Sequence, residues 1–168
     1  MKQILIFLIF LPLLGCNNLI ENKQTSINFN CPRVFFSSED RIFIDNSTSI
    51  DDIGIKAEFN NFAIKKQCME QENIAIIPVD ILIEVKPISN LEESSLTVPI
   101  YVTLLDANDK VLEIQYFSVL GSINRNSETN DLIKTDITDR LKVVTKYLNT
   151  SQLVIGFMID KEKRNLIN

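Results

Sequence analysis

The run Val79-Asp80-Ile81-Leu82-Ile83-Glu84-Val85 places a β-branched residue at every second position. Successive side chains of a β-strand point to opposite faces, so this period of two is typical of a strand with one buried face. Pro78 and Pro87 flank the run, and we expect the strand to end at both because proline has no backbone N–H to donate. The run therefore predicts a strand in a sheet with one covered face.

A second alternation of the same kind extends from Leu96 to Leu104. Pro99 lies inside it and predicts an edge strand or a bulge. Asp106-Ala107-Asn108-Asp109-Lys110 has the composition of a turn, and Val111 to Leu120 returns as the partner strand of a hairpin. This strand, turn and return strand resemble the hairpins of sandwich domains common on bacterial surfaces and in the periplasm, a resemblance that implies a fold class and no function.

Further apolar bursts separated by polar turn clusters predict more strands. They are Arg33 to Phe36, Arg41 to Ile44, Ile53 to Ile64 and Leu153 to Ile159. Residues 134–149 fit two structures, because their apolar spacing suits a helix capped by Thr135 or Asp136, yet Ile133 to Leu141 also suits a strand. We favour a strand followed by a short helical turn in that segment.

About seven or eight strands with hairpin-length connections predict an all-β fold. The expected architecture is an antiparallel β-sandwich, immunoglobulin-like or fibronectin-like, with at most one short helix. Hydrophobic residues make up 45% of the chain and charged residues 23%, which is a globular composition. The formal net charge is −5 and clustered cations are lacking, so nucleic acid is not expected as a partner.

The N-terminus has the order of parts of a secretory signal: Lys2, an apolar run from Ile4 to Leu14, and then Gly15. The run is too short for a transmembrane helix, which needs about 20 residues. Its end, Leu13-Leu14-Gly15-Cys16, resembles the lipobox of bacterial prolipoproteins. The alternative is a buried N-terminal helix, but the run has no amphipathic stripe to bury.

This resemblance implies that a peptidase removes residues 1–15 and that Cys16 carries a covalent lipid such as palmitate. Two or three acyl chains hold a protein stably on a membrane. In Gram-negative lipoproteins Asp after the cysteine favours the inner membrane, so Asn17 implies the outer membrane, on its periplasmic side. Residues 16–30 are polar and predict a flexible tether, and residues 31–168 form the expected sandwich domain.

Two further cysteines, Cys31 and Cys68, remain in the mature chain. An even number of cysteines in an oxidising compartment predicts a disulfide bond. Closing this loop would stabilise the fold by about 3 to 4 kcal/mol in the chain-entropy model. The alternative is a pair of buried free thiols.

The chain has no histidine, which removes the commonest general base, the Ser-His and Cys-His nucleophile pairs and the commonest metal ligand. The four glycines lie far apart, so no phosphate-binding loop can form and no cofactor is expected. Asp106, Asn108 and Lys110 begin like a calcium loop, but Lys at the third ligand position fits a plain turn instead. No metal site is therefore expected.

Two adjacent carboxylate pairs, Asp51-Asp52 and Glu92-Glu93, are the candidates for acid–base chemistry. Both lie in polar, turn-like stretches, so we interpret them as solvated loops. Tyr101 and Tyr116 lie on the predicted hairpin and would form an exposed aromatic patch for a protein or glycan if they pair across it. Such pairing is also ordinary sheet stabilisation, and Phe35-Phe36 is the other aromatic candidate.

Three functions remain open on these residues. The first is a non-catalytic interaction or accessory module of an envelope assembly, held at the membrane by its lipid and bound to an envelope protein. The second is a carrier of a small ligand or lipid, with a cavity of about 300 Å³ or more between the sheets. The third is a hydrolase that uses carboxylates alone. We favour the first, a protein that is not an enzyme, because the usual catalytic groups are missing.

Overall fold

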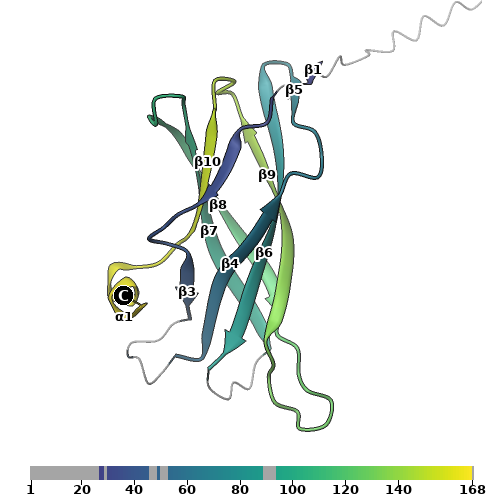
Figure 1. Ribbon diagram of the computed structural model, residues 1–168, viewed down its shortest axis with the longest axis vertical. Helices are drawn as coiled ribbons and strands as arrows, with labels where there is room; N and C mark the ends of the chain where they lie inside the picture. The colour runs from purple at the N-terminus through teal and green to yellow at the C-terminus, as the bar shows by residue number, and fades with distance from the viewer. Residues whose placement is uncertain (1–26, 29, 46–48, 50–52, 89–93, 168) are drawn as a thin grey trace, which may run out of the picture.

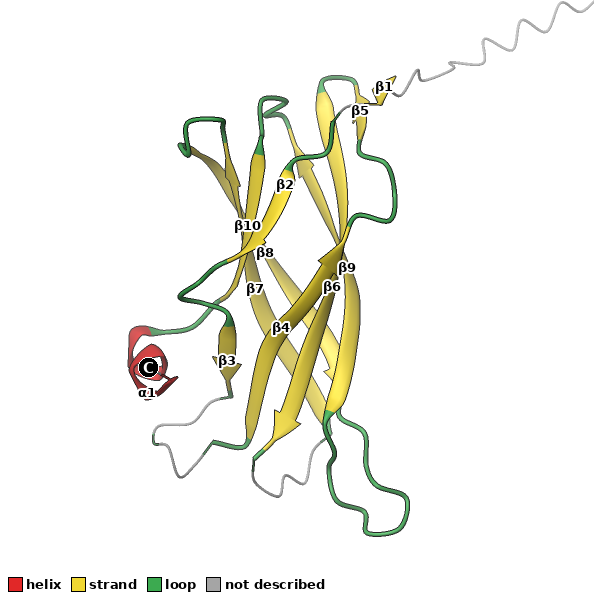
Figure 2. Ribbon diagram, viewed as in Figure 1, coloured by secondary structure: helices red, strands yellow, loops and turns green. Residues whose placement is uncertain are grey.

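The computed structural model describes residues 27–28, 30–45, 49, 53–88 and 94–167, and most of these residues lie in strands (Figures 1 and 2). Along the chain the elements are β1 (Ile27–Asn28), β2 (Arg33–Phe36), β3 (Ile42–Ile44), β4 (Ile55–Ala63), β5 (Met69–Gln71), β6 (Ile74–Pro87), β7 (Ser95–Leu105), β8 (Val111–Ser122), β9 (Thr135–Thr145), β10 (Gln152–Phe157) and the helix α1 (Lys161–Ile167).

The strands form two sheets that pack face to face. Sheet 1 has the order β1-β5-β6-β4-β3, with β9 on the other side of β6, and sheet 2 has the order β2-β10-β7-β8. All pairs are antiparallel except β2 with β10. The β7–β8 hairpin of sheet 2 lies in sequence between β6 and β9, which pair in sheet 1. The predicted all-β sandwich with one short helix is confirmed.

The core lies between the sheets and is made of the alternate residues of the long strands. In β6 the buried residues Ala75, Ile77, Val79, Ile81, Ile83 and Val85 continue the period of two seen in the sequence, and Pro78 is buried as well. Phe59 stacks on Phe157 at a centroid distance of 3.9 Å and on Phe36 at 4.6 Å. Full burial of one such ring stabilises the fold by about 1.5 to 3 kcal/mol.

The expected end of the central strand at Pro78 is wrong, because β6 begins at Ile74 and continues through Pro78, whereas the expected end at Pro87 is confirmed. Pro78 is paired with Lys142 of β9 on one side. On its other side β4 ends opposite Asp80 and β5 begins opposite Ile76, so β6 has no partner at Pro78 there. A proline is tolerated in a strand where no ladder bond needs its N–H.

The expectation of an edge or a bulge at Pro99 is also wrong. β7 is a central strand, and its register shift lies at Leu104 and Leu105 instead. Pro99 lies just beyond the last β10 pair, in which Phe157 is opposite Ile100, and its carbonyl still accepts the Met158 N–H at 2.9 Å. The missing N–H of Pro99 thus falls where the ladder with β10 has ended.

Residues 134–149 are mainly extended: β9 spans Thr135–Thr145 and pairs with β6 over its whole length. A turn follows, in which the Thr150 N–H donates to the Tyr147 carbonyl at 3.1 Å. The favoured strand is therefore confirmed, and the helix of the fold is α1 at the charged C-terminus. Pairing along β6 decides this segment, because eleven ladder positions outweigh a weak helical pattern.

The disulfide bond between Cys31 and Cys68 is present, with a Cα–Cα distance of 5.3 Å. It joins the chain ahead of β2 to the connection between β4 and β5. Strand pairing is described ahead of Cys31 as well, because Ile27 and Asn28, inside the predicted tether, pair with β5. Nothing is described for the lipobox or for Cys16, which lie outside the described residues.

Candidate docking surface

Ion pairs lie on the outer face of sheet 1 along β6 and β9, and at the other end of this face Met69, Ile74 and Val144 are exposed. Arg140 of β9 binds the Asp80 carboxylate of β6 through Nε at 2.5 Å and Nη2 at 3.0 Å. Four residues further along β6, Glu84 binds Lys134 and Lys86. The hydrogen bond from Arg140 holds the pKa of the Asp80 carboxyl below its usual value, and that from Lys134 does the same for the pKa of Glu84.

A groove of about 500 Å³ crosses this charged face over β4, β6 and β9. Its polar side chains include Asn61, Lys65, Asp80, Thr138 and Arg140. Lys65 also lies 3.7 Å from the Asp80 carboxylate, so both cations in the groove already share that anion. The groove is therefore occupied by its own ion pairs, which an incoming charged ligand would have to break.

The outer face of sheet 2 is different, because exposed apolar side chains gather on it. Residues paired across a sheet share a face, and the register places Thr103 opposite Ile114 and Thr97 opposite Leu120. Val154 connects this face to Phe35 on β2. We call the apolar face the set of large exposed side chains on this side: Phe35 (42% exposed), Ile114 (46%), Tyr116 (66%) and Leu120 (74%).

Tyr101 and Tyr116 are directly opposite each other on this face, as the sequence suggested. They differ in what they contact. The Tyr101 ring lies over Gly156, where an added Cβ would come within 2.4 Å of the ring, and its hydroxyl donates to Asp40 at 2.6 Å. Tyr116 extends into solvent, so it is the tyrosine that is free to contact a partner.

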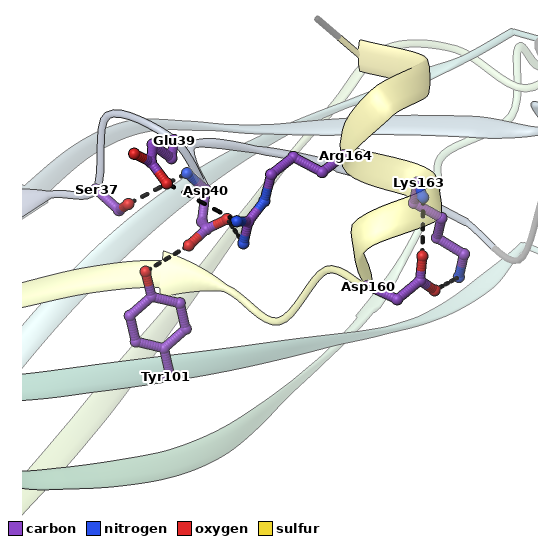
Figure 3. Close-up of polar contacts among 7 residues, drawn as sticks. All are labelled: Ser37, Glu39, Asp40, Tyr101, Asp160, Lys163 and Arg164. Atoms are coloured by element: carbon purple, nitrogen blue, oxygen red, sulfur yellow. Dashed lines mark hydrogen bonds and ion pairs between the residues drawn. The ribbon is translucent and has the colours of Figure 1, made fainter.

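A cluster centred on Asp40 fastens the C-terminal helix beside this face (Figure 3). The Asp40 carboxylate is 7% exposed and accepts the Tyr101 hydroxyl on one oxygen and Arg164 Nη2 on the other, both at 2.6 Å. Glu39 lies 3.8 Å from Arg164. Burial raises the pKa of the Tyr101 hydroxyl, and its hydrogen bond to the Asp40 carboxylate raises it further.

Asp160 begins the helix, since its carboxylate accepts the Lys163 N–H at 2.8 Å, as an N-cap does. Between α1 and sheet 2 lies an open hollow of about 510 Å³ with Pro99, Met158 and Ile159 in its wall. Of its three charged groups, Asp40 and Arg164 bind each other and Asp160 caps the helix. The cluster therefore serves to hold the helix on the sheet.

The remaining candidates from the sequence are not part of a shared site. Asp106 forms the turn of the β7–β8 hairpin, where its carboxylate accepts the N–H groups of Asn108 and Lys110. Phe36 points into the core, whereas Phe35 belongs to the apolar face. Asp51-Asp52 and Glu92-Glu93 lie outside the described residues. In the part of the chain that is described, no helix is long and apolar enough to cross a bilayer.

The sequence reasoning missed Ile114 and Leu120 as surface residues and Asp40 and Arg164 as partners. A signal for the first two exists, because the even-numbered positions of β8 are as apolar as its odd-numbered ones. A strand with apolar residues on both faces must expose one of them if it lies in a two-layered fold. Comparison with protein-family models, with curated proteins and with solved structures finds no match to this chain.

Proposed function

We propose that this chain is a lipid-anchored, non-catalytic docking module that binds a protein partner of the cell envelope through the apolar face of sheet 2. The observation on which the proposal depends is the contrast between the two outer faces. The outer face of sheet 1 carries ion pairs and has Met69, Ile74 and Val144 exposed by 38 to 41%. The outer face of sheet 2 exposes Ile114, Tyr116 and Leu120 of one strand by 46 to 74%, with Phe35 on β2. Contiguous exposed apolar side chains are typical of protein interaction sites.

The packing of the core favours a docking module over a carrier of lipid or a small ligand. Buried aliphatic and aromatic side chains from both sheets fill the space between them, and many of these residues are fully inaccessible to solvent. The two hollows of about 500 and 510 Å³ are open to solvent on the outside of the sandwich, and charged and apolar residues line both. A carrier of lipid would need an enclosed apolar cavity between the sheets.

Two of the described carboxylates, Asp80 and Glu84, are unsuited to the acid step of a hydrolase. A general acid that works near neutral pH needs a raised pKa. Asp80 and Glu84 have pKa values shifted in the opposite direction, because each is bound by cations. They are suited to stabilising the outer face of sheet 1 and not to donating protons.

The membrane attachment is proposed from the sequence Leu13-Leu14-Gly15-Cys16. The disulfide bond is consistent with an oxidising compartment such as the periplasm. β1 lies at the same end of the sandwich as the turns of the β5–β6 and β7–β8 hairpins (Figure 1). An anchor at Cys16 would therefore attach the domain by one end and leave the side of sheet 2 open to a neighbour.

The test is chemical crosslinking of the full-length protein in its own envelope, followed by purification. Leu120→Asp places a charge in the apolar face, and we expect recovery of the crosslinked partner to fall about tenfold or more, since burying an unpaired charge is costly. Thr138→Asp adds the same charge on the outer face of sheet 1 and should leave recovery unchanged. Cys16→Ser should abolish it by releasing the protein from the membrane.

Equal recovery with Leu120→Asp and Thr138→Asp would exclude the apolar face as the docking surface. Catalytic turnover of a glycan or ester by the purified protein, lost when Asp80 or Glu84 is replaced, would instead favour a hydrolase. Unchanged recovery with Cys16→Ser would contradict the lipid anchor alone.

A further inference from the structure

The open edge of β8 stands out among the sheet edges of the described chain. An edge strand exposes unpaired backbone N–H and C=O groups, and proteins protect such edges by making them short or charged. β1, β2 and β3 are two, four and three residues long. β9 is long, but it carries Asp136, Asp139, Arg140 and Lys142. β8 has twelve residues and a single charge, Glu113.

The segment from Ile114 to Leu120 has no charge, no proline and no glycine. Its residues are mainly aromatic, aliphatic and β-branched, which is the composition of strands that add to other strands. Glu113 is also engaged, because its carboxylate accepts the Thr145 hydroxyl at 2.7 Å. The Gln115 side-chain amide likewise donates to the Val144 carbonyl of β9 at 2.8 Å, so the first part of β8 contacts β9. Beyond these two contacts the edge lacks the features that usually prevent strand pairing.

The ladder with β7 determines which backbone groups face this edge. The Ile123 N–H donates to the Ser94 carbonyl at 2.7 Å, and the pair continues the register of β7 with β8. Hydrogen-bonded and non-hydrogen-bonded pairs alternate in an antiparallel ladder, so the odd-numbered residues of β8 bond to β7. The N–H and C=O groups that point to the open edge are those of Ile114, Tyr116, Ser118 and Leu120.

The same four residues point their side chains to the outer face, and three of them are large and exposed. A strand that paired with this edge would satisfy their backbone groups and extend the apolar face by one strand. We infer that the partner docks by adding an extended, uncharged segment of alternating apolar residues to β8 as a fifth strand of sheet 2. This inference rests on the proposed function, because it names how the docking surface binds.

A segment of another protein fits this edge better than a second copy of the chain. Antiparallel pairing of β8 with its own copy would point the two sandwiches in opposite directions, with their β1 ends far apart. β6 alone, with 14 residues, spans about 46 Å. In a pair that stands upright on the membrane, one copy has its β1 end on the side away from the membrane. Residues 17–26 of that copy reach at most about 36 Å when fully extended, which is too short for its Cys16 to reach the same membrane.

The test measures amide hydrogen exchange by NMR on the full-length lipidated protein in nanodiscs. The probe is a synthetic peptide of alternating valine and threonine with a lysine at each end, added up to millimolar concentration. We expect exchange at Ile114, Tyr116, Ser118 and Leu120 to slow by about tenfold or more, while the odd-numbered amides, already bonded to β7, stay unchanged.

Ser118→Pro removes one N–H that points to the open edge of β8 and leaves the hydrogen bonds to β7 in place. It should therefore abolish the slowing of amide exchange by the peptide. Its unfolding midpoint should stay close to that of the matched control Ser118→Ala. The control should keep the slowing. If Ser118→Pro unfolds the protein, the alternation of even and odd amides in the unmodified chain remains the test.

Three results would overturn the inference. The first is that the peptide does not slow amide exchange in β8, and the second is that it slows the even-numbered and odd-numbered amides alike. The third is that exchange slows as the protein concentration rises without peptide, which would identify a second copy as the occupant. The envelope crosslinking with Leu120→Asp is independent of this experiment. A loss of crosslinking with Leu120→Asp but not with Ser118→Pro would retain the docking surface and exclude strand addition.

Discussion

Asp40 shows how a single buried charge is tolerated in this sandwich. Both of its oxygens accept short hydrogen bonds, one from Tyr101 and one from Arg164, and its own N–H donates to the Ser37 hydroxyl at 3.1 Å. A buried carboxylate is stable only when it is paired and hydrogen-bonded. The cluster therefore joins the β2–β3 connection, the centre of sheet 2 and the C-terminal helix.

Asp40→Asn removes the charge that balances Arg164, whose Nε is buried without a hydrogen-bond partner. We expect a loss of about 1 to 3 kcal/mol in the free energy of unfolding, because the guanidinium keeps its desolvation cost and loses its anion. Tyr101→Phe deletes one hydrogen bond and should cost about 1 kcal/mol. Urea denaturation measures both, and an Asp40→Asn cost no larger than that of Tyr101→Phe would contradict the pairing.

The turns of the hairpins have the backbone conformation that their local sequence favours. Glu72 and Asn73 both have positive φ, 52° and 63°, and join β5 to β6, as a two-residue turn of the hairpin type requires. Asp109 has a φ of 60° in the β7–β8 turn. The disulfide adds a constraint that the hairpins lack, because it joins segments that are 37 residues apart.

Replacing Cys31 and Cys68 together by alanine should lower the free energy of unfolding by about 3 to 4 kcal/mol, since the unfolded chain regains the entropy of an open loop. Differential denaturation with and without a reducing agent is the measurement. The reductant should destabilise the natural protein and have no effect on the double variant. An equal response of the two proteins would mean that the bond does not form in the cell.

At the scale of the molecule, the charged face of sheet 1 predicts how stability depends on pH. The pKa values of Asp80 and Glu84 are lower in the folded chain than in the unfolded one, because Arg140 and Lys134 bind the charged forms. Such groups stabilise the fold above their unfolded pKa values of about 4, and this contribution is lost as the pH falls through the lowered folded values.

The urea midpoint should therefore fall as the pH decreases from about 5 to 2. Arg140→Gln removes the main cause of the shift at Asp80 and should flatten this dependence, whereas Thr138→Gln, on the same strand and face, should preserve it. A curve for Arg140→Gln as steep as that of the natural protein would show that the ion pair does not hold the Asp80 pKa down in solution.

The alternation in β6, the turn at Asp106 and the even pair of cysteines are local signals. From them the sequence by itself determined the long strands, the hairpin and the sandwich class, and it favoured the disulfide, but it predicted neither β1 nor β5. Only the tertiary structure decided that Asp40 binds Arg164, which is 124 residues away. It also placed Pro78 and Pro99 where strand pairing on one side is interrupted or has ended, and it exposed the even-numbered face of β8. The physical reason is that the backbone of a single strand sets the period of its side chains. Which strand becomes its neighbour, and which of its faces is buried, depend on pairing between segments far apart in the chain.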